Sequence, residues 1–130
     1  MATVADVMVK DVLTVDPSDT IGEAAEKMNA ANVGAVVVVE DFARIVGIVT
    51  ERDLLRAVAA RARAAEARVR QWMTPNPVTI EPDLTIDEAA KIMFDRNFRH
   101  LPVVKDGRPL GIVSLRLLAR WAFESVQTPQ

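Results

Sequence analysis

The sequence predicts an α/β (α+β) fold made of two copies of one β-α-β-β-α unit. The first observation is an internal repeat, since a shift of 65 positions places Met8 on Met73 and Thr20-Ile21 on Thr85-Ile86. The second is that each copy has a helical apolar periodicity followed by two short apolar runs. Later in the copies the register changes by one residue, and Gly47-Ile48-Val49 aligns with Gly111-Ile112-Val113.

Each copy begins with a short strand, at residues 13–15 or 78–80, and a proline-containing turn follows it. Thr20 or Thr85 is placed to cap the next helix. The apolar positions of that helix recur at i, i+3, i+4 and i+7, which indicates one buried face; they are Ile21, Ala24, Ala25 and Met28, and then Ile86, Ala89, Ala90 and Met93.

The second half of each copy predicts a hairpin and a helix. Apolar strands are expected at residues 35–39 and 45–49, and again at 101–104 and 110–113, with polar residues between them. The last helices begin near Glu51 and Leu115. We therefore expect repeats at residues 1–62 and 70–126 and a linker at 63–69. A copy of this size does not easily bury its own sheet, so the two sheets should pack about a pseudo-twofold axis as one module.

The connection between the copies, residues 59–70, is rich in Ala and Arg and contains no Gly or Pro, which predicts an extension of the preceding helix and then a turn. Its arginines could meet an acidic partner or nucleic acid. A solvated helix face is the favoured interpretation, because no aromatic residues are interleaved to stack on bases.

Composition narrows the class of protein. The chain has 130 residues, half of them hydrophobic, and a net charge of −2, which argues against a dedicated nucleic-acid-binding protein. It has no cysteine for disulfides or thiolate metal sites. No signal peptide is visible and no apolar run is long enough to span a membrane, so we expect no membrane association and a cytoplasmic location.

The repeated pattern, with an apolar strand after the first helix and Gly-Ile-Val-Thr or Gly-Ile-Val-Ser after the second strand, resembles the cystathionine-β-synthase (CBS) domain over residues 4–125. The resemblance implies a stand-alone CBS pair, a regulatory module with two clefts between its repeats. Members bind adenosine-containing ligands there. It implies AMP, ADP or ATP as candidate ligands, less readily S-adenosylmethionine or NAD(H), and no required cofactor.

The heptad Gly47 to Asp53 resembles the ligand motif of the family, Gly-h-x-Thr/Ser-x-x-Asp, where h is apolar. Thr50 stands at a strand-to-helix junction, where free N–H groups favour anions, and Arg52 lies within the same motif. Asp53 offers two oxygens to the cis-diol of a ribose. Thr-x-x-Asp is equally the pattern of a helix capping box, and both roles can hold when no ligand is bound.

The resemblance also assigns the other wall of this first cleft. Pro77 and Val78 would lend backbone groups to the adenine, and Phe98 would border the base. Arg99 and His100, just before Pro102, would face the phosphates, Arg99 with a fixed charge and His100 with a charge that depends on pH. A surface pair beside an apolar strand is the alternative for these two residues.

The second cleft is predicted to be weaker. Its motif ends in Leu117 where the first copy has Asp53, so Ser114 has no acidic partner for a diol. The opposite wall, residues 33–37, has neither charge nor proline. The residues assigned to this cleft are Leu13, Gly34, Ala35 and Ser114.

No catalytic or metal site is predicted. One histidine and no cysteine exclude common triads and metal clusters, and there is no phosphate-binding glycine loop. The repeated methionines are expected in the core. We therefore expect a sensor that is not an enzyme and that signals to an unidentified effector protein. The alternatives are a purely structural dimerisation module and, remotely, an enzyme of unrecognised mechanism. A homodimer is expected through helix faces that include Leu54, Leu55, Val58, Leu117, Leu118 and Trp121.

Overall fold

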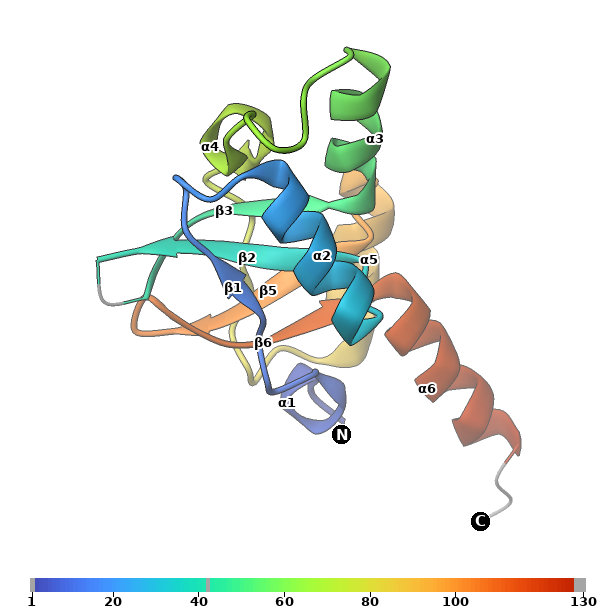
Figure 1. Ribbon diagram of the computed structural model, residues 1–130. Coiled ribbons are helices and arrows are strands. Elements are labelled where there is room, and N and C mark those ends of the chain that lie inside the picture. The colour runs from blue at the N-terminus through green and yellow to red at the C-terminus, as the bar shows by residue number, and fades with distance from the viewer. Residues whose placement is uncertain (1, 42, 128–130) are drawn as a thin grey trace. The chain divides into compact units, whose positions relative to one another are not determined.

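The computed structural model describes residues 2–41 and 43–127 (Figure 1). Its helices and strands confirm the predicted fold class and the repeated β-α-β-β-α order. The elements are α1 (Val4–Val7), β1 (Thr14–Val15), α2 (Ile21–Ala31), β2 (Ala35–Glu40), β3 (Arg44–Thr50), α3 (Glu51–Ala59), α4 (Val69–Trp72), β4 (Thr74–Pro75), α5 (Ile86–Arg96), β5 (His100–Lys105), β6 (Arg108–Ser114) and α6 (Leu115–Gln127). The short elements α1, α4 and β4 were not predicted from the sequence.

Capping fixes both ends of the two equivalent helices, α2 and α5. Thr20 and Thr85 are the N-caps, as predicted, and each accepts a hydrogen bond from the backbone N–H three residues later. Glu23 and Glu88 complete capping boxes by accepting the N-cap N–H groups. At the other end Asn32 and Asn97 adopt the left-handed conformation that asparagine tolerates at a helix terminus.

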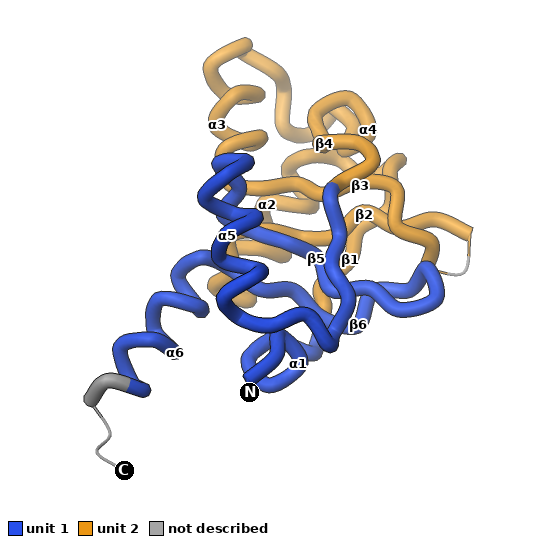
Figure 2. Tube along the Cα trace, turned by 180° about the vertical axis from the view of Figure 1, so that it is seen from behind, with its two compact units in different colours: residues 1–11, 78–130 blue, residues 12–77 orange. Residues whose placement is uncertain are grey.

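The chain divides into two compact units, residues 12–77 and residues 1–11 with 78–130 (Figure 2). Within the unit of residues 12–77, four strands form one sheet in the order β1-β2-β3-β4. β1 is parallel to β2, and the other neighbours are antiparallel. A short parallel strand at one edge and an antiparallel strand at the other thus flank the central hairpin.

The other unit repeats this arrangement with shorter pairings. β5 and β6 form the antiparallel hairpin. Ile80 bridges Val103 in parallel, and Val9 bridges Ile112 in antiparallel orientation. The sequence shift places Ile80 on Val15 and Val9 on Thr74, so the two units have equivalent strand order.

The compact units and the sequence repeats divide the chain differently. The N-terminal segment that contains α1 belongs to the unit of the second repeat, and α4 belongs to the unit of the first. In the unit of residues 12–77 the backbone N–H groups of Ile21 and Gly22 donate to the carbonyls of Ala67 and Ala64 at 2.9 Å. The predicted linker, residues 63–69, is therefore bonded to the N-terminus of α2.

The predicted extension of α3 into this linker is wrong. The helix ends at Ala59, and Arg61 takes the left-handed conformation with φ of 64°. The N–H of Arg61 donates to the Val58 carbonyl, and the N–H of Ala62 donates to the Ala57 carbonyl, which together form a Schellman motif. The sequence concealed this end because glycine or asparagine usually marks such a position.

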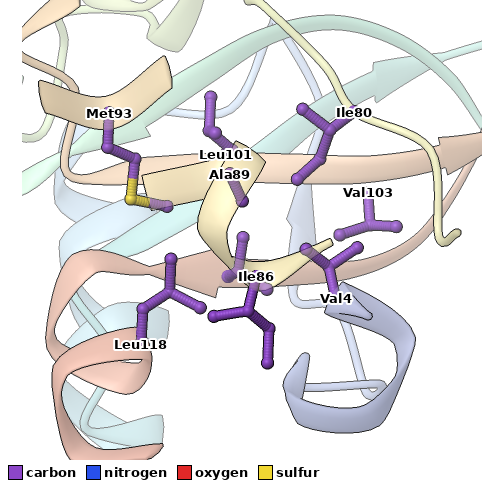
Figure 3. Close-up of a cluster of buried hydrophobic side chains, with 9 residues drawn as sticks. Val4, Ile80, Ile86, Ala89, Met93, Leu101, Val103 and Leu118 are labelled. Atoms are coloured by element: carbon purple, nitrogen blue, oxygen red, sulfur yellow. The ribbon is translucent and has the colours of Figure 1, made fainter. Parts of the chain in front are cut away.

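Each unit has its own apolar core. In the unit of residues 12–77, buried side chains of β1, α2, β2, β3 and α4 pack together; they are Val15, Ala24, Met28, Val36, Val38, Val49 and Val69. Figure 3 shows the equivalent cluster of the other unit, formed by Val4, Ile80, Ile86, Ala89, Met93, Leu101, Val103, Val113 and Leu118. The helix faces predicted from periodicity therefore do contribute to the cores.

The four repeated methionines lie in or against these cores, as predicted. Met28 and Met93 are buried, and Met73 and Met8 are half-buried and pack against the clusters. A Cβ added to Gly47 would lie 2.5 Å from the sulfur of Met73, and one added to Gly111 would lie 2.6 Å from that of Met8. The glycine of each repeated motif thus makes room for the methionine that precedes the edge strand.

Candidate functional site

The first motif lies where β3 runs directly into α3. Thr50 ends the strand and is the N-cap of the helix. Its hydroxyl accepts the N–H of Asp53 at 3.3 Å, and Asp53 Oδ2 accepts the N–H of Thr50 at 2.9 Å. The capping-box interpretation of Thr-x-x-Asp is therefore confirmed, and the ribose role of the same carboxylate stays a prediction.

Asp53 is the one charged side chain that is buried in the part of the chain that the structure describes, with 4% of the residue exposed. A buried carboxylate is costly unless it is hydrogen-bonded. Besides the cap, Oδ1 accepts from Nη1 of Arg56 at 2.9 Å and from the Thr74 hydroxyl at 3.4 Å. Thr74 reaches the carboxylate because β4 pairs with β3, opposite Ile48.

These contacts to Oδ1 were not predicted from the sequence. Arg56 stands three residues after Asp53, a helical spacing that could have revealed it. Its guanidinium carbon also lies 5.8 Å from the centroid of the Trp72 ring, within the range of a cation–π interaction. Trp72 and Thr74 come from α4 and β4, and no spacing in the sequence indicates that they approach Asp53.

The structure places two residues assigned to the second cleft beside this same motif. Ala35 lies opposite Thr50 in the β2–β3 ladder, and the carbonyl of Gly34 accepts the N–H of Glu51 at 3.1 Å. Gly34 thus helps to satisfy the free N–H groups at the start of α3. Arg52, on the first turn, is exposed.

The second motif repeats the strand-to-helix junction of the first motif but lacks its carboxylate. Ser114 ends β6, and its Oγ accepts the N–H of Leu117 at 3.0 Å. The serine therefore caps α6 as Thr50 caps α3, but the leucine supplies no carboxylate. This agrees with the predicted loss of a diol acceptor in the second copy.

The Phe98-Arg99-His100 segment is adjacent to this second motif within its unit. His100 pairs with Ser114 in the β5–β6 ladder, and the carbonyl of Arg99 accepts the N–H of Leu115 at 2.8 Å. Phe98 is half-buried and packs against the core, whereas the Arg99 residue is exposed. Pro102 is fully buried within β5. The structure groups these residues with Ser114, and their approach to Asp53 stays a prediction.

The remaining assigned residues lie just before β1 and just before the Ile80 bridge, outside the strands themselves. Pro77 is half-buried, and Val78 packs against a core cluster. Leu13 lines an open groove of about 510 Å³ together with Val12, Thr14, Lys27, Ala30 and Ala31. The Lys27 ammonium donates to the Thr14 carbonyl at 3.0 Å, so the cation in this groove has a backbone partner.

The described residues offer neither a metal-binding cluster nor a membrane-spanning helix. No group of three or more His, Cys, Asp or Glu side chains among them could hold a metal ion. None of the helices in residues 2–41 and 43–127 combines the length and the apolar character needed to cross a membrane.

Comparisons with known proteins identify relatives along the full length. A 17.7 kDa protein of Acidianus ambivalens is 41% identical over 132 aligned positions, which cover 100% of this chain and 79% of the relative. A protein with CBS domains from Burkholderia ambifaria has a TM-score of 0.90 at 30% identity and covers 98% of both chains.

Two similar structures were solved with ligands. The protein CBSX2 in complex with AMP has a TM-score of 0.81 at 27% identity, with 97% of this chain and 99% of that chain covered. The CBS domain pair of MJ0100, in complex with 5′-methylthioadenosine and S-adenosylmethionine, has a TM-score of 0.86 at 29% identity, with 93% and 99% covered. The CBS domain model matches residues 4–60 and 69–124, and this chain therefore belongs to the CBS domain family, as a tandem pair.

Proposed function

We propose that this chain is a regulatory module, not an enzyme, that binds an adenosine-containing nucleotide and relays its bound state to a partner protein. The observation that carries the proposal is the buried carboxylate of Asp53 at the N-terminus of α3, in the position of the family's ligand motif. AMP, ADP and ATP are the preferred ligands, ahead of S-adenosylmethionine and NAD(H). A cytoplasmic location, where such nucleotides circulate, belongs to the proposal.

The chemistry of the first motif suits a ribonucleotide. A cis-diol presents two O–H donors, and the carboxylate of Asp53 has two oxygens to accept them. The Thr50 hydroxyl and the N-terminal end of the nine-residue helix α3, where the helix dipole favours negative charge, suit a phosphate or ribose oxygen nearby. Asp53 thus selects a ribose over a deoxyribose, while the junction tolerates negative charge.

The remaining groups are proposed to hold the base and the phosphates. Arg99 is exposed, and its guanidinium has five N–H donors that can bond phosphate oxygens. His100 at the start of β5 would add a second polar group, and Phe98 with the backbone at Pro77 and Val78 would border the adenine. Relatives solved with AMP and with S-adenosylmethionine support this class of ligand.

One ligand per chain is expected. The second copy has the serine cap without the carboxylate, because Leu117 replaces the aspartate. A diol there would find no charged acceptor. The residues assigned to that cleft, Leu13, Gly34, Ala35 and Ser114, also include no charged side chain.

A titration calorimetry panel tests the function. AMP should bind with a stoichiometry near one per chain, and 2′-deoxy-AMP should bind more weakly because it offers one hydroxyl fewer. Binding should also raise the melting temperature by mass action. Equal affinity for AMP and 2′-deoxy-AMP would remove Asp53 from the ligand site. Two equal sites per chain would contradict the proposed asymmetry.

A structural dimerisation module is the second candidate. It is favoured by the complete internal bonding of Asp53 and by the exposure of Leu55 and Val58, 67% and 68%, on one side of α3. Leu118, also expected on a dimer face, is instead buried in a core, while Leu54 and Trp121 pack against cores. A stable dimer that no adenosine compound stabilises would select this candidate over the sensor.

A further inference from the structure

Both carboxylate oxygens of Asp53 already accept hydrogen bonds from the chain. A carboxylate has about four lone-pair positions, and four donors occupy them. Oδ2 accepts from the Thr50 N–H at 2.9 Å and from the Thr50 hydroxyl at 3.2 Å. Oδ1 accepts from Arg56 at 2.9 Å and from the Thr74 hydroxyl at 3.4 Å. A ribose diol brings two further donors, so it can bind only where existing bonds give way.

Of the bonds to Asp53, the two to Oδ1 can be broken at the lowest cost. The Thr50 N–H belongs to the capping box of α3, and its release would cost about 1 kcal/mol of helix stability. The Thr74 contact is long and needs only a rotation of the hydroxyl. The side chain of Arg56 is 56% exposed, while that of Asp53 is 5% exposed, so the guanidinium is the mobile member of the ion pair.

Trp72 offers Arg56 an interaction that does not depend on the ion pair. The guanidinium carbon lies 5.8 Å from the ring centroid, so a favourable cation–π position is available beside the ion pair. Arg56 also occupies the last turn of α3, where the helix dipole favours a cation. When Arg56 leaves Oδ1, it keeps its interactions with the Trp72 ring and with the helix dipole.

The second copy shows the arginine without the acid. Arg120 is the counterpart of Arg56 in the shifted sequence, and Leu117 is the counterpart of Asp53. Arg120 Nε instead donates to Glu124 at 3.2 Å, four residues on. The shift places Trp72 opposite Val7, so the second copy lacks the aromatic ring as well. The arrangement of acid, arginine and tryptophan occurs once in the described chain.

We infer that Arg56 is a latch, a positioning residue that competes with the ribose diol for Oδ1 of Asp53 and so sets both the affinity and the salt dependence of the site. This inference rests on the proposed function. In the latched form the carboxylate is paired and buried, and diol binding exchanges the Arg56 bond for ribose hydroxyls. The residue thus weakens binding while protecting the buried acid.

The test uses adenosine, which has the diol and no charge, titrated calorimetrically into the parent and into Arg56→Met. Methionine keeps an apolar side chain beside Trp72 and removes the ion pair. We expect adenosine to bind about two- to fivefold more tightly to Arg56→Met, the range set by ion pairs with an exposed member. The gain should be smaller for 2′-deoxyadenosine. Arg56→Gln, a second variant, should also bind adenosine more tightly.

Salt provides an independent readout. Raising the ionic strength from about 0.01 M to about 1 M shortens the Debye length from about 30 Å to about 3 Å and weakens the exposed side of the ion pair. Adenosine affinity of the parent should therefore rise with salt, and that of Arg56→Met should stay constant. Arg63→Met is the matched control, since it removes an 81% exposed arginine and a 3.8 Å pair with Glu66 elsewhere in the same unit. It should behave as the parent.

Each outcome decides the inference. Unchanged or weaker adenosine binding by Arg56→Met, with binding retained by the parent, overturns the latch and leaves the proposed function standing. An equal gain for adenosine and 2′-deoxyadenosine also overturns it. Absence of adenosine binding to both proteins overturns the proposed function and the latch together. Binding that is measurable only in Arg56→Met supports the latch.

Discussion

Replacement of Asp53 by alanine separates the helix cap that this carboxylate forms from its proposed role in ribose binding. In the folded chain the side chain caps α3 through Thr50 and would, in the bound state, accept ribose hydroxyls. Loss of hydrogen bonds to a charged acceptor costs about 1.5–3 kcal/mol, which corresponds to about a ten- to hundredfold loss of AMP affinity. We therefore expect Asp53→Ala to lose most of its nucleotide binding.

The expected loss of stability is smaller. Removal of a helix cap costs about 1 kcal/mol, or about 3–6 °C in melting temperature for a chain of this size. The donors left behind are not fully buried, because Thr50 is half-buried and the Arg56 side chain is 56% exposed, so water can replace the carboxylate. Melting temperature and AMP affinity of the same variant are measured by calorimetry.

Glu23→Ala is the matched control. It removes the acid of an equivalent capping box, formed with Thr20 at the start of α2, and leaves Asp53 in place. It should lower the melting temperature and preserve AMP affinity. If Asp53→Ala also melts early but binds AMP as the parent does, the carboxylate is only a cap and the ribose assignment is refuted.

The remaining predictions concern the phosphates, assembly and pH. Arg99→Ala should weaken AMP binding and spare adenosine, which has no phosphate; equal losses for both would place Arg99 elsewhere. Light scattering at micromolar concentration should show a homodimer, and Leu55→Glu, by charging an exposed apolar position on α3, should shift it toward monomer; a parent that is already monomeric contradicts this. Hydrogen bonds from Thr20 hold the pKa of Glu23 below its ordinary value. The stability from this bond is present above the unfolded pKa of about 4.3 and is lost as pH falls through the folded pKa. In acid melting curves Glu23→Gln should remove that part of the pH dependence, and an unchanged slope would show that the bond contributes nothing.

Much of the fold could be read from the sequence, because its signals are local. The helix caps at Thr20 and Thr85, the buried faces of α2 and α5 and the two hairpins depend on residues within one or two turns of each other. The repeat supplied each of these signals twice. The Thr-x-x-Asp cap was visible for the same reason, as was the absence of an acid at Leu117.

Contacts between distant segments were decided only by the tertiary structure. The assignment of α1 and α4 to the unit of the opposite repeat, and the bonding of the linker to Gly22, depend on chain paths that no periodicity encodes. The end of α3 at Ala59 was hidden because Arg61, which is not a glycine, adopts the left-handed conformation just after it.

The same division holds at the candidate site. The sequence by itself determined the family, the fold class and the carboxylate that one copy has and the other lacks. Only the tertiary structure decided which residues from other elements surround that carboxylate. Thr74 reaches Asp53 because β4 pairs with β3. Trp72 reaches Arg56 from α4. A buried charge must find donors wherever the folded chain supplies them, and one of these donors, the Thr74 hydroxyl, lies 21 residues away in sequence.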